Sequence, residues 1–130
     1  NQDKENLIVK RYKHFIVMLN NFPYSSGHLL IIPLSHKKAL EDLSEEERIE
    51  LMEIIVRCII ALKKILHNDG TNVGFNLESK AAGASIPDHL HCHILPRKQG
   101  DTGFIQTISD TSVIISNMQK LYEKLEELLN

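Results

Sequence analysis

The sequence has few cysteines, almost no net charge and no long apolar run. Cys58 and Cys92 are too few for a disulfide framework, and we expect them to be buried thiols of a protein in a reducing compartment. The formal net charge of −2 at pH 7 gives no overall attraction to nucleic acid or to an anionic membrane, so an anionic ligand has to be held by local groups. Because we find neither a signal peptide nor an apolar run long enough to span a bilayer, we expect a cytoplasmic protein.

Length and hydrophobic content indicate a single core. The chain has 130 residues, of which 42% are hydrophobic, and this supports one core but not two. We find no internal repeat and no linker, so we interpret residues 1–130 as one domain. The sequence begins with Asn1 rather than Met, and we therefore expect that further residues can precede it.

The most informative stretch is residues 88–97, where histidine alternates with apolar residues. Side chains on a β-strand alternate between the two faces, so His89, His91 and His93 should point to one side and the apolar residues between them to the other. Histidine has an unperturbed pKa close to neutrality, which makes three imidazoles on one face a set of donors, acceptors or nucleophiles at cellular pH.

Apolar runs rich in β-branched residues predict the other strands, and two capping signatures predict helices. The predicted strands are residues 7–9, 14–19, 28–33 and 73–77. The run 28–33 is almost continuously apolar, which indicates a central strand buried on both faces. Ser44 with Glu47 predicts the start of a long helix, and Ser116 with Gln119 predicts the start of the last helix. We expect an α+β fold with a largely antiparallel sheet.

The long predicted helix carries a broad apolar stripe. Its members recur at helical spacing and are Leu51, Met52, Ile55, Cys58, Ile59, Leu62, Ile65 and Leu66. Ile54, Val56 and Ile60 widen the stripe beyond what one sheet face can cover. We therefore predict that part of the helix contacts a second subunit. The alternative is a helix buried completely within one chain, which we disfavour at this chain length.

Three histidines on one face allow three interpretations. They can bind a metal such as Zn²⁺, they can act in covalent catalysis at phosphorus, or they can lie on a solvated strand without chemistry. Spacing does not separate the first two. The neighbouring Asn20, Asn76, Arg97 and the small residues 83–85 suit phosphate oxygens better than a metal, which favours phosphorus chemistry.

The segment His89-Leu90-His91-Cys92-His93-Ile94-Leu95 resembles the motif of the histidine triad superfamily of nucleotide hydrolases and transferases, in which three histidines alternate with hydrophobic residues. The resemblance extends over nearly the whole chain. The segment 19–33 with His36 and residues 43–46 follows the order of this superfamily. The segments 69–77, 82–88 and 96–102 are similar to the branch that contains diadenosine tetraphosphate phosphorylases and fragile-histidine-triad-like hydrolases. The resemblance implies an α+β fold with an antiparallel sheet of about five strands, one long helix and one C-terminal helix, and a homodimer.

The resemblance also assigns roles to residues. It implies that His91 is the nucleophile that takes a nucleotidyl group from an α-phosphate, that His93 contacts phosphate oxygens and assists the leaving group, and that His89 supports the strand. The nucleotide and phosphate site would be formed by Asn20, His28, Asn76, Gly83 and Ser85. Fixed donors of this kind stabilise charge that develops in the transition state.

The expected substrates are dinucleoside polyphosphates or related nucleotidyl compounds, with adenine nucleotides favoured. Two alternatives belong to other classes. One is a nucleotide-binding regulatory protein with vestigial phosphoramidase activity, and the other is an enzyme that uses the triad as zinc ligands. Activity on diadenosine polyphosphates separates the first alternative, and the effect of chelation separates the second.

The chain departs from relatives of this family at several positions. Lys98 stands where many relatives have Trp, and Gly103 stands where they have Asn. Many relatives hold a structural zinc with a Cys-x-x-Cys pair and two histidines. His36 and His89 occupy the histidine positions, but the sequence contains no such cysteine pair. We therefore expect that no cofactor is required for the chemistry and that a structural zinc requires a cysteine pair before Asn1.

Overall fold

A computed structural model describes residues 2–20, 26–78, 89–99 and 111–130. In this part of the chain, five strands form one antiparallel sheet in the order β1-β2-β3-β5-β4. The strands are β1 (Ile8–Arg11), β2 (Phe15–Leu19), β3 (Leu29–Pro33), β4 (Gly70–Gly74) and β5 (Cys92–Arg97). The helices are α1 (Gln2–Glu5), α2 (Glu45–Leu66) and α4 (Thr111–Leu129), with a short 3-10 turn at Leu40–Asp42. The predicted α+β class is confirmed.

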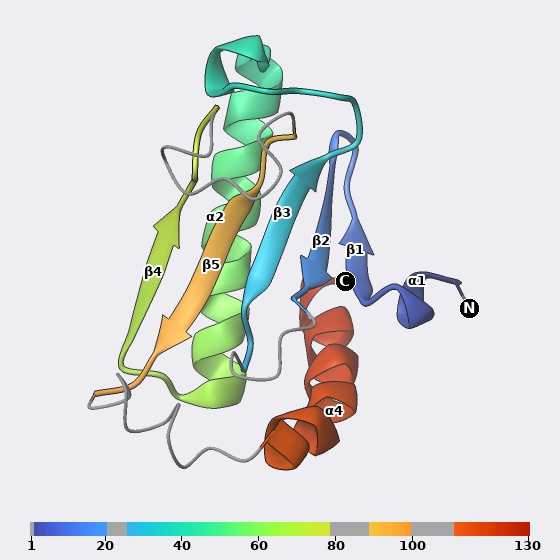
Figure 1. The fold of residues 1–130 in the computed structure, drawn as a ribbon, viewed down its shortest axis with the longest axis vertical. Coiled ribbons are helices and arrows are strands. Elements are labelled where there is room, and N and C mark those ends of the chain that lie inside the picture. The colour runs from blue at the N-terminus through green and yellow to red at the C-terminus, as the bar shows by residue number, and fades with distance from the viewer. Residues whose placement is uncertain (1, 21–25, 79–88, 100–110) are drawn as a thin grey trace.

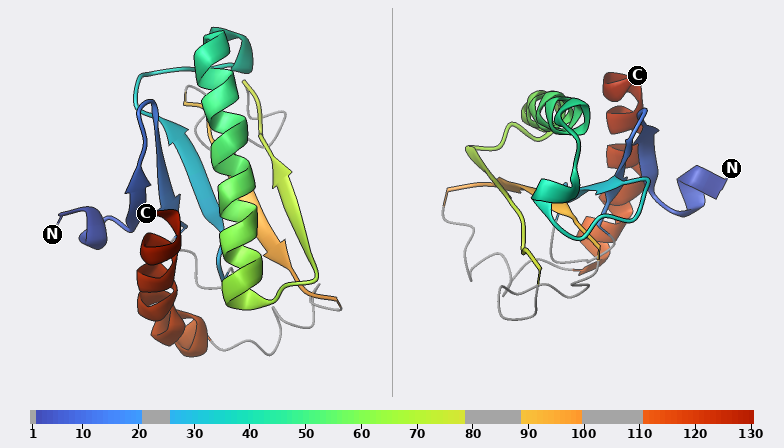
Figure 2. Two further views of the ribbon diagram at one scale, coloured as in Figure 1. Left: turned by 180° about the vertical axis from the view of Figure 1, so that it is seen from behind. Right: turned by 90° about the horizontal axis from the view of Figure 1, so that it is seen from above.

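Both long helices lie on the same face of the sheet (Figure 1, Figure 2). Alternate residues of the central strands point towards these helices and are fully buried, including Val17, Ile31 and Ile94. The residues between them, such as Leu30 and His93, form a cross-strand pair on the opposite face, where both are only partly buried. The described residues place no helix over that face. The sheet therefore separates a hydrophobic core from a more open surface that carries histidine.

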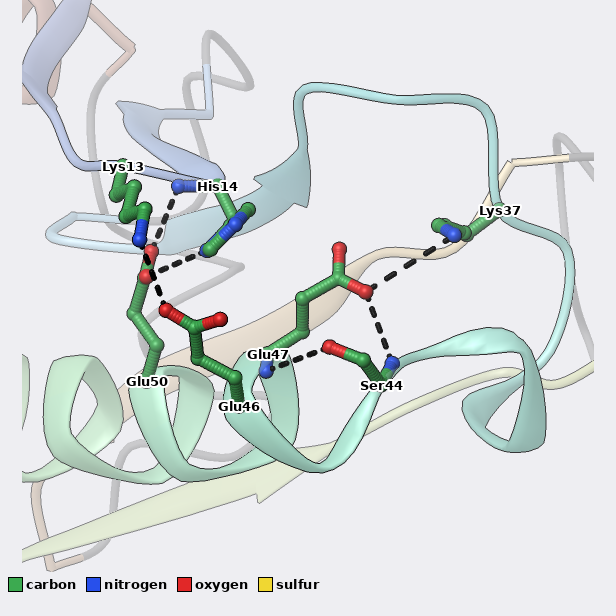
Figure 3. Close-up of polar contacts among 7 residues, drawn as sticks. All are labelled: Lys13, His14, Lys37, Ser44, Glu46, Glu47 and Glu50. Atoms are coloured by element: carbon green, nitrogen blue, oxygen red, sulfur yellow. Dashed lines mark hydrogen bonds and ion pairs between the residues drawn. The ribbon is translucent and has the colours of Figure 1, made fainter.

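Helix α2 begins and ends where local sequence signals predict. The Ser44 hydroxyl accepts a hydrogen bond from the Glu47 backbone N–H at 3.1 Å, and the Glu47 carboxylate accepts one from the Ser44 N–H at 2.8 Å (Figure 3). This reciprocal capping box satisfies two N–H groups that have no partner within the helix. At the other end His67 adopts a left-handed conformation with φ of 51° and terminates the helix.

Three element predictions need correction. Helix α4 begins at Thr111, before the predicted cap at Ser116, because no glycine or proline in 111–115 prevents the helix from extending backwards and serine is tolerated inside helices. Strand β4 covers Gly70–Gly74 rather than 73–77, because its pairing with β5 begins directly at Gly70 and Arg97. Strand β3 is central, but it is fully buried on one face only.

The histidine-rich segment is also less regular than predicted. Strand β5 begins at Cys92, after His89 and His91, and it continues through Pro96 instead of ending before it. Pairing between β3 and β5 ends at Leu29 and Ile94, so β5 has one neighbouring strand left when it reaches Pro96. A proline is tolerated there because one side of the strand is already an edge.

Candidate active site

The structure brings the three predicted triad rings together. Leu90, Cys92 and Ile94 point into the core and are at most 3% exposed, so the histidines between them emerge on the other side and are half-buried. The ring centroids of His89 and His91 are 5.6 Å apart, and those of His91 and His93 are 6.2 Å apart. Three imidazoles therefore form a continuous row on the open face of the sheet.

A chain of hydrogen bonds from β2 and β3 reaches His93. The Asn20 side-chain nitrogen Nδ2 lies 3.0 Å from Nδ1 of His28, and Nε2 of His28 lies 3.0 Å from Nδ1 of His93. An amide nitrogen can only donate, so Nδ1 of His28 accepts and its Nε2–H donates to His93. His93 then carries its own proton on Nε2, which makes that nitrogen a donor. The predicted residues Asn20 and His28 thus contact the triad through its last member.

The site favours the neutral form of His28, His91 and His93. Burial, with a smaller effect from the neighbouring His93, lowers the pKa of His28 from 6.5 to about 4. Burial also lowers the pKa of His93 and, together with the adjacent imidazoles, that of His91. A neutral imidazole has a free lone pair, so these rings can act as nucleophiles or acceptors at pH 7.

His91 lies between His89 and His93 in the row. Burial is the largest cause that lowers the pKa of its ring, followed by the two adjacent imidazoles, and the His89 backbone has a smaller opposite effect. A neutral imidazole carries a proton on one nitrogen and a lone pair on the other, which is the state required of a nucleophile.

A shallow cavity of about 320 Å³ lies beside His93 and His28, a volume at the lower end of the range of small-molecule sites. Its walls come from the edge strand β4, from its neighbour β5 and from the residues after β4, namely Asn72, Val73, Gly74, Phe75, Asn76 and Leu95. The predicted Asn76 is thus on the same cavity as the triad. Asn72, Phe75 and Leu95 were missed, because their position depends on the register between β4 and β5.

Two predicted site residues, Gly83 and Ser85, lie outside the described residues.

The two cysteines are not nucleophiles in this environment. Cys92 and Cys58 are both buried free thiols, and burial raises the pKa of each to about 12. A thiol with this pKa is almost entirely protonated at pH 7 and is chemically inert.

His36 and His89 meet beside the triad, as the resemblance implies. Their ring centroids are 5.6 Å apart with perpendicular planes, and the buried Nε2 of His89 has no hydrogen-bond partner. A structural zinc site needs four ligands, and these two imidazoles supply half of them. Within the described residues no group of three or more His, Cys, Asp or Glu side chains is placed to hold a metal, so these residues do not by themselves fit a zinc site.

Comparisons with known proteins agree with this geometry. The family model of the HIT domain matches residues 1–100. A Mycobacterium tuberculosis protein named AP-4-A phosphorylase is 41% identical over 112 residues, which cover 86% of this chain and 57% of that protein. The bis(5'-nucleosyl)-tetraphosphatase [asymmetrical] of Schizosaccharomyces pombe is 28% identical over 85% of this chain and 56% of its own length. The chain thus spans little more than half of each of these relatives.

A solved structure shares the fold. The zinc-bound histidine triad family protein of Mycobacterium smegmatis matches with a TM-score of 0.69 and 26% identity, over 94% of this chain and 87% of that protein. No helix in the described part of this chain is long and apolar enough to cross a membrane. The triad row, the shared fold and the family match over most of the chain lead to one conclusion: the chain belongs to the HIT domain family.

Proposed function

We propose that this protein is a nucleotidyl hydrolase or transferase that acts through a covalent intermediate on His91. The observation that carries the proposal is the position of His91, which is half-buried in the middle of the histidine row and whose pKa is lowered by burial and by the adjacent imidazoles. A nucleophile held in this way needs no separate base to activate it.

The reaction has two steps. The free nitrogen of His91 attacks the α-phosphorus of the substrate, so that a P–N bond forms and the bond to the leaving phosphate oxygen breaks. The leaving phosphate oxygen departs as an anion and accepts a hydrogen bond from the Nε2–H of His93. Water or inorganic phosphate then attacks the same phosphorus and loses its proton to solvent. The P–N bond breaks, its electron pair returns to the nitrogen of His91, and a nucleoside monophosphate or diphosphate is released. Positioning and charge stabilisation supply most of the rate enhancement in such transfers.

We further propose that the substrates are dinucleoside polyphosphates with adenine as the favoured base. Support comes from the names of the two relatives, which refer to a phosphorylase and to a tetraphosphatase. The cavity beside His93 has apolar walls and two asparagine side chains, a combination that suits a nucleoside. Gly83 and Ser85 remain the proposed donors to the phosphate.

We propose that the protein works as a homodimer in the cytoplasm, with residues 1–130 forming one domain. Helix α2 leaves Ile49, Met52, Val56 and Ile60 exposed, by 65%, 60%, 42% and 60% respectively, and their spacing places them in one stripe. A second copy of the chain would bury this stripe. Met52→Glu should therefore shift the sedimentation of the protein from dimer to monomer, whereas a wild-type monomer would contradict the proposal.

The proposed cytoplasmic location is supported by the two free cysteines, which fit a reducing compartment.

The central test replaces the nucleophile. His91→Gly should abolish turnover of diadenosine tetraphosphate while binding of the nucleotide is kept, and His67→Asn, which changes an exposed imidazole at the end of α2, should leave turnover unchanged. Assays with and without inorganic phosphate distinguish a phosphorylase from a hydrolase. Turnover by His91→Gly would contradict the mechanism.

Two results with the wild type would favour another class of protein. Binding of the nucleotide without any turnover would favour a regulatory nucleotide-binding protein. Loss of turnover on chelation would favour a zinc-dependent enzyme.

A further inference from the structure

His93 has different neighbours on the two sides of its strand. On one side it pairs with Leu30 of β3, and Nε2 of His28 from the same strand lies 3.0 Å from its Nδ1. On the other side it pairs with Gly74 of β4. Residues that pair directly in an antiparallel sheet have Cβ atoms about 4.5–5.5 Å apart, so a side chain at position 74 would lie beside the His93 ring. Glycine leaves this side of the ring open.

The backbone does not require glycine at position 74. The φ of Gly74 lies outside the left-handed region, and a Cβ at this position would have no atom within 4 Å. Gly74 ends strand β4, and glycine in a strand loses more conformational freedom on folding than other residues and has no side chain to pack. Neither the backbone nor the packing therefore explains why position 74 has no side chain.

The open side of His93 belongs to the cavity of about 320 Å³. Gly74 and His93 both line this cavity, and so does the next pair on the same face of the sheet, Asn72 with Leu95. The cavity thus extends along β4 and β5 away from His93. Gly70 lies on the same face of β4 and also has no atom within 4 Å of a Cβ, but it does not line the cavity. The strand therefore contains two comparable glycines, of which only one adjoins the site.

The end of the cavity away from His93 lies close to a positive charge. Nη1 of Arg97 donates a hydrogen bond to Oδ1 of Asn72 at 3.3 Å. A guanidinium is charged at any cellular pH, so it favours an anionic group in this part of the cavity. In the proposed reaction the leaving oxygen accepts a hydrogen bond from the Nε2–H of His93. The rest of the leaving group has to continue from this point, and the cavity offers it a path towards Asn72.

We propose that Gly74 determines which leaving groups the site accepts. The phosphate chain of the leaving group passes over Gly74, between the His93 ring and Asn72, and a side chain at position 74 would occupy this path. A leaving group of a single atom ends before it reaches the path. This inference rests on the proposed function for its kinetic consequence, whereas its consequence for binding does not require turnover.

The kinetic test uses two substrates that share the adenylyl group and differ in the leaving group. Diadenosine tetraphosphate loses ATP, and adenosine 5′-phosphorofluoridate loses a fluoride ion when the P–N bond forms and the P–F bond breaks. Gly74→Val should lower kcat/KM about 10²-fold for the first substrate and less than about threefold for the second, because only ATP needs the blocked path. Gly74→Ala should lie between the wild type and Gly74→Val.

Gly70→Val is the matched control and should equal the wild type with both substrates, because its side chain lies outside the cavity. Both valine variants should have urea midpoints at least as high as that of the wild type, since valine favours a strand. An equal change of kcat/KM for the two substrates in Gly74→Val, including no change in either, would overturn the inference. So would a loss of diadenosine tetraphosphate turnover in Gly70→Val that matches the loss in Gly74→Val.

Binding gives a readout that does not need turnover. Calorimetric titrations are made in the His91→Gly background, so that the ligand is not consumed. Adding Gly74→Val should weaken binding of diadenosine tetraphosphate about tenfold or more and leave binding of AMP unchanged, whereas adding Gly70→Val should change neither. Unchanged binding of diadenosine tetraphosphate with Gly74→Val would overturn the inference. If the wild type turns over neither substrate, the proposed function fails, but these affinities still decide whether position 74 controls access for the part of the ligand beyond the α-phosphate.

Discussion

The two ends of the triad are held in different ways. His93 lies within β5, paired with Leu30 of β3 and Gly74 of β4, and its ring contacts His28 directly. His89 precedes the strand, and the backbone there is held by Lys37 from outside the sheet. The sheet thus fixes the end of the triad that faces the cavity, while a segment outside the sheet holds the other end. Strand pairing holds one end by several hydrogen bonds, and the other end depends on single contacts.

The largest expected difference between the two ends is in catalysis. His93→Ala removes the proposed hydrogen-bond donor to the leaving oxygen and should lower kcat/KM about 10²- to 10³-fold. His36→Ala at the other end removes a ring contact with His89 only and should lower kcat/KM by less than about tenfold, because other contacts hold this end. Steady-state kinetics of both variants measure the difference. Equal losses in the two variants would contradict the division between the ends.

A smaller effect is expected on stability at the His93 end. Gly27 precedes His28 and has a φ of 80°, and a Cβ at this position would lie 2.6 Å from Cδ1 of Leu66. Gly27→Ala should therefore lower the free energy of unfolding by about 1–3 kcal/mol. Gly70→Ala is the matched control, since its Cβ would have no atom within 4 Å. Urea denaturation measures both, and a Gly27→Ala variant as stable as the control would show that α2 can move away from this turn.

The smallest expected effect is the pH dependence of stability from His28. Its pKa is about 4 in the folded protein and near 6.5 when unfolded, so the unfolded chain binds more protons between these values. The stability contributed by neutral His28 is complete above pH 6.5 and is lost as the pH falls towards 4. Discounted for its partial exposure, the loss is on the order of 1 kcal/mol. In His28→Asn, the fall in unfolding free energy over this range should be shallower, and an identical slope would contradict the assignment.

Local signals predicted the elements whose structure is determined locally. The capping box at Ser44 fixes the start of α2, and alternation around His91 gives the face of each triad residue, so both were correct from sequence. Strand β4 was misplaced because it is an edge strand with exposed Asn72 and Val73, and an edge strand exposed on both faces shows no alternation. The start of α4 was misplaced because a serine with a glutamine three residues later also occurs inside helices.

Contacts that depend on register or on backbone groups were not predictable. The lining of the cavity by Leu95 follows from how β4 and β5 are aligned, and sequence patterns do not specify this alignment. The Lys37 carbonyl binds Leu90 through the main chain, and every residue has a carbonyl, so no residue type indicates the contact. The ring pair of His36 and His89 was expected from family resemblance and not from spacing.

Mass spectrometry of the trapped enzyme can detect the covalent intermediate on His91. The protein is mixed with diadenosine tetraphosphate, quenched within one turnover, and digested under conditions that preserve a P–N bond. We predict that one adenylyl group is attached to the peptide that contains His91 and that fragmentation assigns it to this residue. An adenylyl group on another histidine, or turnover without any adduct under conditions that trap it, would contradict the mechanism.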